Sequence, residues 1–210
     1  MSWRMREVNV DFLDPKFVRL ASYLAAAGKT WRDPETNTLK TIVRGKYMST
    51  VYPLFSEFFP DAKRAIMGEQ DEKTGRSNIA FCINDYEILD MLESGGFYLG
   101  SKKRKPPVYV VTDAKLFAVY LRVLWEVHGR ISSVDPLQIN LEQKYPQELK
   151  ELHTLFNAVK IPCHLIKTDD NYILHFSGAE DVKSFFRLLD FQADAQYGQA
   201  KLEKIAHLLK

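Results

Sequence analysis

Cysteine is scarce in this chain, and its scarcity excludes two kinds of site. Only Cys82 and Cys163 occur among 210 residues. They are too few for a disulfide framework and lack the spacing of metal ligands, so we expect two buried thiols. The five histidines also form no HxxxH or HxH pair. The sequence therefore predicts no structural metal site.

Long apolar runs and phosphate-binding glycine loops are missing as well. No run of about 18 apolar residues occurs, and charges interrupt residues 1–17, where a secretory signal would be apolar. We therefore expect a cytoplasmic protein without a membrane anchor. The stretch AAAGKT (25–30) lacks the first glycine of a phosphate-binding loop and follows a predicted helix, which is the wrong context for nucleotide hydrolysis.

The overall composition is that of a folded protein with no strong charge preference. Hydrophobic residues make up 46% and charged residues 27%, with a formal net charge of +2. A chain of this length can bury a substantial core, and wholesale disorder is not expected. The small positive charge permits a polyanionic partner without requiring one, so an argument for nucleic acid depends on where the cations lie.

The second half of the chain alternates single helices with hairpins. Residues 114–128 have helical apolar spacing between a capping Asp113 and Gly129. PLQINLEQ (136–143) alternates apolar and polar residues like a half-buried strand. A helix at 145–159, a hairpin that turns at Asp169-Asp170 and a closing helix complete the order.

The first half repeats this order, with a helix at 15–27, a hairpin, a helix, a hairpin that turns near 73–75, and a helix. The simplest account is an α+β fold of two pseudo-symmetric αββαββα repeats, each with a four-stranded antiparallel sheet. Between them, residues 98–112 contain KKRK and Pro106-Pro107, which predict a solvated basic linker. The predicted boundaries are 1–97 (first repeat), 98–112 (linker), 113–191 (second repeat) and 192–210 (C-terminal helix).

Two nonapeptides in register carry a family resemblance. LASYLAAAG (20–28) and LRVLWEVHG (121–129) both begin with Leu, end with Gly and precede the same order of elements. In this the chain resembles the LAGLIDADG homing endonucleases in their single-chain, pseudo-twofold form. The resemblance implies that the two motif helices pack together at the centre, helped by the small residues of the first. It also implies that the two sheets form a saddle which lies in the DNA major groove.

The resemblance places catalytic acids at the eighth position of each nonapeptide, where this chain has Ala27 and His128. In active members the paired carboxylates hold divalent metals beside the scissile phosphates. Ala27 has no ligand atom, and imidazole is a poor ligand for magnesium. Glu126 lies about 200° around the helix from His128 and does not obviously replace it. We therefore expect no cofactor and a loss of cleavage, with Mg²⁺ required only if the chain is a diverged endonuclease.

The strands that the resemblance places on DNA carry suitable side chains. The amides of Gln138 and Asn140 can pair with adenine, and His175, on the same strand face as Asn171, can also contact DNA. Four cations of the first repeat can neutralise phosphates; these are Lys29, Arg32, Lys40 and Arg44. A simpler reading is that the amides only solvate the outer side of a half-buried sheet.

The predicted partner is double-stranded DNA, bound by a monomer acting as a transcriptional regulator or architectural protein. One alternative is an endonuclease that holds metal through Glu126, His128 or acids outside the motif, such as Asp33 or Asp135. A second alternative is a maturase-like protein that binds structured RNA through phosphates and shape.

Overall fold

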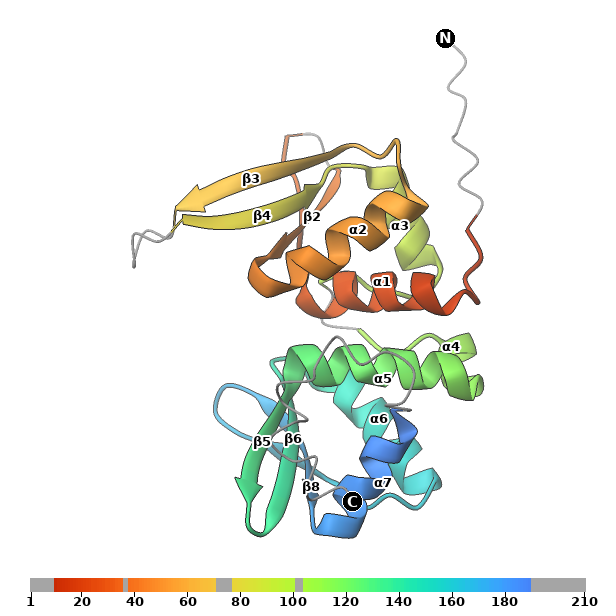
Figure 1. Ribbon diagram of the computed structural model, residues 1–210, viewed down its shortest axis with the longest axis vertical. Helices are drawn as coiled ribbons and strands as arrows, with labels where there is room; N and C mark the ends of the chain where they lie inside the picture. Colours follow the sequence, from red (N-terminus) through yellow and green to blue (C-terminus); the bar gives the residue numbers. More distant parts are fainter. Residues whose placement is uncertain (1–9, 36–37, 71–76, 101–103, 190–210) are drawn as a thin grey trace.

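The computed structural model describes residues 10–35, 38–70, 77–100 and 104–189, and these form two similar halves that meet along a pair of helices (Figure 1). The predicted helix at 192–210 and the predicted turn near 73–75 lie outside the described residues. The first half contains α1 (Pro15–Ala27), β1 (Lys29–Arg32), β2 (Leu39–Arg44), α2 (Met48–Phe58), β3 (Arg64–Gln70), β4 (Ser77–Ile83) and α3 (Tyr86–Ser94). The second contains α5 (Ala114–His128), β5 (Gly129–Val134), β6 (Leu137–Gln143), α6 (Pro146–Ala158), β7 (His164–Lys167), β8 (Tyr172–Ser177) and α7 (Ala179–Leu188).

Each half has one four-stranded antiparallel sheet, and the two strand orders are equivalent. The orders are β1-β2-β4-β3 and β5-β6-β8-β7. The described helices lie on one side of each sheet (Figure 1). We call the opposite side the helix-distal face. The fold class predicted from the sequence, two αββαββα repeats with four-stranded sheets, is confirmed.

The two motif helices, α1 and α5, begin in the same way. The Asp14 carboxylate accepts a hydrogen bond from the Lys16 amide at 2.8 Å. The Asp113 carboxylate accepts from the amides of Lys115 and Leu116 at 2.8 and 2.9 Å. Each cap satisfies backbone donors that have no partner within the helix, which fixes where the helix starts.

Both motif helices also end at a glycine, for a steric reason. Gly28 and Gly129 have φ near −74° and −73°, so neither needs the left-handed conformation that usually favours glycine after a helix. A Cβ at Gly28 would collide with the Leu24 carbonyl, and a Cβ at Gly129 with the Trp125 carbonyl and ring. Glycine is therefore required here because the strand leaves the helix end very closely.

The two motif helices lie side by side at the centre (Figure 1), and the largest side chain of α5 packs within its own half. Ala21 and Ser22 are fully or almost fully buried. Trp125 is buried too, but its ring packs against Phe185 and Phe186 of α7, with centroids 5.9 and 5.1 Å away. The largest side chain of the second motif thus fills the core of its own half, leaving α5 free to approach α1.

The second part of the predicted linker at 98–112 is helical. Residues 108–112 form a short helix, α4 (Val108–Thr112), which starts directly after Pro107. Proline disfavours a helix in the residues before it. It is well tolerated, however, at the position directly before a helix, which Pro107 occupies here. Val110 is fully buried, so the segment is part of the core.

Candidate nucleic-acid interface

The helix-distal face of the second sheet carries the predicted polar residues side by side. Asn140 of β6 is paired with His175 of β8, and the His175 Nδ1 donates to the Asn140 Oδ1 at 2.8 Å. Gln138, two positions earlier on β6, lies on the same face. Burial, and then the neighbouring His164, lower the pKa of His175, so its ring is neutral at pH 7 and its Nε2 can accept a hydrogen bond.

Two further charged groups lie on this face. Arg130 of β5 pairs with Glu142 of β6, with 3.0 Å between Nε and Oε2. The Asn171 amide donates to the other Glu142 oxygen at 3.4 Å. The second sheet therefore presents amides, an imidazole, a guanidinium and a carboxylate close together. Such a set can match the hydrogen-bond donors and acceptors of base edges.

The first sheet places three of its four predicted cations together. Lys29 on β1 is paired with Ile42, which lies between Lys40 and Arg44 on β2, so all three cations share the helix-distal face. Arg32 differs, because it is paired with Leu39, whose buried side chain belongs to the main core on the helix side. Arg32 is exposed, but its side chain starts from the opposite face.

Lys40 has a partner within the chain. Its ammonium forms an ion pair with Asp33 in the β1–β2 turn, and this contact raises the pKa of Lys40. Binding of a phosphate would have to replace or share that carboxylate. Asp33, which the endonuclease alternative invokes as a metal ligand, is thus engaged by a cation of its own hairpin.

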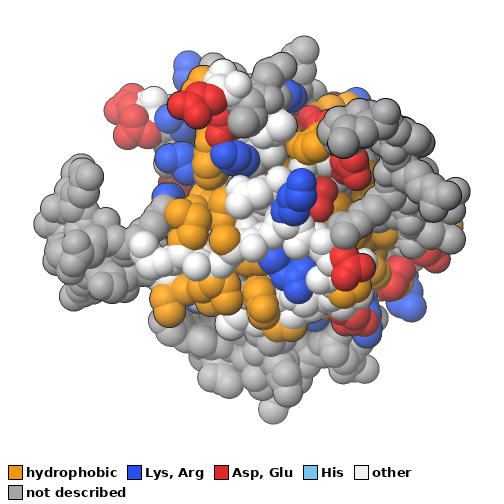
Figure 2. All heavy atoms as spheres, turned by 90° about the horizontal axis from the view of Figure 1, so that it is seen from above, with side chains coloured by type: hydrophobic (Ala, Val, Ile, Leu, Met, Phe, Trp, Pro, Cys, Tyr) orange, Lys and Arg blue, Asp and Glu red, His pale blue; other side chains and the backbone are white. Residues whose placement is uncertain are grey.

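The upper side of the first half carries charges of both signs. Figure 2 looks down on this side and shows Lys and Arg side chains interspersed with Asp and Glu among hydrophobic surface. On β1 and β2, three cations are grouped on the helix-distal face.

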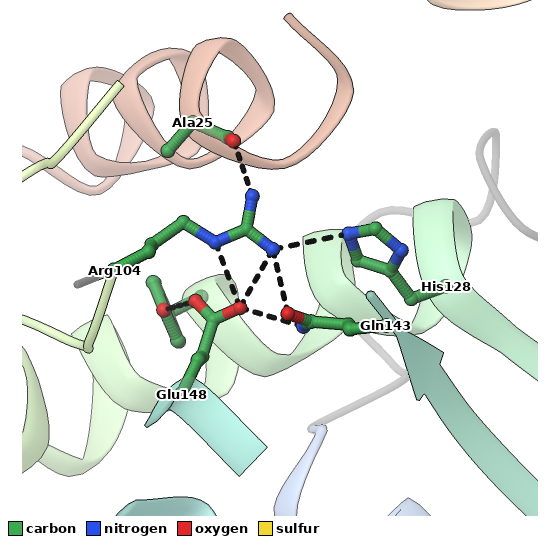
Figure 3. A network of polar contacts seen from close by, with 6 residues as sticks. Ala25, Arg104, His128, Gln143 and Glu148 are labelled. Carbon is green, nitrogen blue, oxygen red and sulfur yellow. Dashed lines mark hydrogen bonds and ion pairs between the residues drawn. The ribbon is translucent and has the colours of Figure 1, made fainter. Parts of the chain in front are cut away.

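Between the sheets, the ends of α1 and α5 hold an arginine that sequence reasoning assigned to a solvated linker (Figure 3). That prediction is wrong for Arg104, whose side chain is only 15% exposed. Its Nη1 donates to the Ala25 carbonyl of α1. Its Nη2 donates to Gln143 Oε1 at 2.7 Å and lies 3.3 Å from the His128 Nε2. Arg104 therefore bridges the two halves beside the second motif's eighth position.

The charge partner of this arginine is a buried carboxylate. Arg104 Nε and Nη2 lie 2.9 and 2.8 Å from Glu148 Oε2, and the Glu148 side chain is 2% exposed. Gln143 Nε2 donates to the same oxygen at 2.6 Å, and the Tyr120 hydroxyl donates to the other. Burial, and then the Glu148 charge, raise the pKa of Tyr120 well above its usual value, so the hydroxyl keeps its proton.

Glu126 belongs to a separate contact between the halves. The Tyr23 hydroxyl of α1 donates to its Oε2, and the Tyr47 hydroxyl lies 3.3 Å from its backbone carbonyl. Burial, and then Glu126, raise the pKa of Tyr23. Glu126 is only 8% exposed, and its carboxylate links α5 to α1 through the hydrogen bond from Tyr23.

The residues at the centre do not fit a divalent metal. Ala27 supplies no side-chain ligand, and both oxygens of Glu148 already accept hydrogen bonds from protein groups. A guanidinium only donates, so the His128 Nε2 that faces Arg104 is the acceptor of that contact. Within the described ranges, no group of three or more His, Cys, Asp or Glu side chains could hold a metal ion.

Gln143, Glu148, Tyr120 and Arg104 are the residues that sequence reasoning missed. Gln143 had one signal, since it follows the alternation of β6 onto the buried side, where an amide needs polar partners. Glu148 lies in a first helical turn, where an acid is normally a surface residue. Nothing in the sequence pairs residue 104 with residue 148.

The fold matches solved structures over most of the chain. The N-terminal LAGLIDADG domain of DUF199/WhiA is 16% identical, with a TM-score of 0.54 and 89% of each chain covered. The chain has the LAGLIDADG fold. The homing endonuclease I-WcaI, bound to its DNA recognition sequence, is 10% identical with a TM-score of 0.59, over 87% of this chain and 83% of that one. I-DmoI, in complex with DNA and calcium, is 10% identical with a TM-score of 0.61, over 90% and 98%.

No family model matches this LAGLIDADG-fold chain, and no curated protein matches it in sequence. Within the described ranges, none of its helices combines the length and apolar character needed to cross a bilayer. Cys82 and Cys163 are both buried, as predicted.

Proposed function

We propose that this chain binds double-stranded DNA across the helix-distal faces of its two sheets. The support is chemical and geometric: three cations share that face of the first sheet, and two amides and a histidine share it in the second. Two solved structures with this fold, those of I-WcaI and I-DmoI, are DNA complexes. Lysine and arginine would neutralise phosphates, and the amides would contact base edges.

We further propose that the bound DNA is not cut, and one observation carries this part. The Arg104 guanidinium lies where the motif helices end, 3.3 Å from His128 and paired with the buried Glu148. A divalent metal brought there would meet a fixed positive charge, and the described carboxylate at that place, Glu148, is already paired with it. Binding without cleavage suits a transcriptional regulator or an architectural protein acting as a monomer in the cytoplasm.

The salt dependence of DNA binding tests the first sheet. Each phosphate contact contributes about 0.9 to the slope of log K against log salt concentration. We expect Lys40→Ala and Arg44→Ala each to reduce the slope by about one, while Arg187→Ala, an exposed arginine on α7, leaves it unchanged. Equal slopes for all three variants and the wild type would remove the first sheet from the interface.

Plasmid nicking tests the absence of cleavage. We expect supercoiled plasmid to stay intact with the wild-type chain in magnesium or manganese. Nicking that disappears in His128→Ala or Glu126→Ala would instead establish the diverged endonuclease. Competition between duplex DNA and structured RNA decides the second alternative, because an RNA-binding protein would be displaced from DNA by the RNA.

A further inference from the structure

The helix-distal faces of the two sheets differ in chemistry, although the repeats share one fold. Ile42, Ala80 and Cys82 form an apolar cluster on the first sheet that is separate from the main core. They are 3%, 0% and 4% exposed. On the second sheet, Asn140 and His175 occupy the places of Ile42 and Cys82, and Gln138 and Glu142 stand where β2 has Lys40 and Arg44.

Two larger apolar side chains stand on the same face of the first sheet and remain accessible. Trp31, two positions after Lys29 on β1, is paired with Lys40 and is 38% exposed. Met67 on β3 is paired with Ala80 and is 42% exposed. Sequence reasoning missed both, although Trp31 alternates with Lys29 on one short strand. Within these strands, the described side chains of this face include no amide.

Accessible apolar groups beside cations constrain what the first sheet can recognise in a DNA groove. The only apolar group that base pairs present in the major groove is the thymine 5-methyl, whereas amides, carboxylates and imidazoles read donors and acceptors. Trp31 and Met67 lie on the two edge strands, and Lys40 and Arg44 lie between them on β2, where they suit phosphates next to such a contact. An apolar patch that shares its face with three cations also favours a polyanion over an uncharged partner.

We propose that the first sheet recognises thymine 5-methyl groups through Met67 and Trp31, while the second sheet reads the hydrogen-bonding edges of bases. The DNA target is then asymmetric despite the pseudo-twofold fold: one half-site is defined by methyl groups and the other by donors and acceptors. This inference rests on the proposed DNA binding and adds which half reads which chemical feature.

Deoxyuridine substitution tests the inference. Sites are first selected from a random duplex library with the wild-type chain. Gln138→Ala then identifies the half-site of the second sheet, because its base preference changes there. Replacing thymine by uracil removes only the methyl group and keeps the base pair. We expect each contacted methyl that is removed from the other half-site to weaken binding about three- to fourfold. Removal from the half-site of Gln138 should leave affinity unchanged.

Met67→Gln provides the matched variant, since Met67 is exposed and the amide has a similar length. Urea unfolding should match the wild type, and the sensitivity of the first half-site to uracil should fall. Three outcomes would refute recognition of methyl groups without affecting the proposed DNA binding. Uracil could weaken binding equally in both half-sites, it could have no effect in either, or the selected first half-site could contain no thymine. A library with no enriched duplex would instead refute the proposed DNA binding itself.

Discussion

Removal of the Arg104 side chain should destabilise the whole protein, although the residue lies outside both repeats. The change leaves the Glu148 carboxylate, 2% exposed, without its charge partner. Breaking a buried ion pair by removing one member costs about 3–5 kcal/mol. Tyr120 and Gln143 still donate to Glu148 in the variant, which keeps the expected loss near the lower limit. We expect Arg104→Ala to lower the free energy of unfolding by about 3 kcal/mol.

A double-mutant cycle separates the ion pair from the other contacts of the arginine. Glu148→Gln removes the negative charge and keeps the shape, and should cost about 1–2 kcal/mol. The double variant should be more stable than the sum of the two changes implies, with a coupling of about 1.5–3 kcal/mol.

Urea unfolding followed by tryptophan fluorescence measures these energies, since Trp125 is buried in the second half. Lys105→Ala is the matched control, because this neighbour is exposed and its removal changes the charge of the same segment. It should alter stability by less than about 0.5 kcal/mol. A loss below that value for Arg104→Ala, or strict additivity in the cycle, would refute the argument that Arg104 compensates a buried charge.

Three further predictions follow from the sheet faces and the motif ends. Because the pKa of His175 is lowered, the ring gains its charge only as pH falls below about 6.5, and that charge should strengthen DNA binding; His175→Gln should remove part of the gain in titrations from pH 7.5 to 5.5. The same protonation works against folding, since the folded pKa lies below the unfolded one, so stability declines over that range. Gly129→Ala should cost about 2–3 kcal/mol in urea unfolding because its Cβ would collide with the carbonyl one turn earlier, whereas Gly68→Ala, with open space around it, should be near neutral. Ala27→Asp combined with His128→Asp should bind manganese by calorimetry only when the guanidinium beside them is also removed; tight binding in its presence would contradict the charge argument.

The arrangement of elements was predictable from the sequence because it depends on local patterns. The cap at Asp113, the period of α5 and the alternation of β6 each act within a few residues. Their repetition in the same order then indicated two copies of one unit. The role of the glycines was less accessible, since the requirement at Gly28 comes from close approach to the Leu24 carbonyl and not from a positive φ.

For the centre of the molecule, the sequence predicted only that the two motif carboxylates are missing. Ala27 and His128 could be read directly as positions without carboxylates. What stands there instead could not be, because Arg104 reaches Ala25 in one half and Glu148 in the other across long stretches of chain. A run such as KKRK is normally solvated, and a single member of it becomes buried only where a tertiary contact supplies a carboxylate.

The charges around the motif ends explain why an arginine lies at that place. The C-terminal ends of α1 and α5 point the same way and meet there, and each carries partial negative charge on its last carbonyls, one of which, on Ala25, accepts from Arg104. Glu148 adds a full negative charge that water does not reach. A cation is therefore needed at the centre even without the motif carboxylates, and a guanidinium can satisfy a carbonyl, an amide oxygen and a carboxylate at once because its donors are fixed in one plane. Arg104 thus meets the electrostatic need of the packed helices with a cation that belongs to the chain itself.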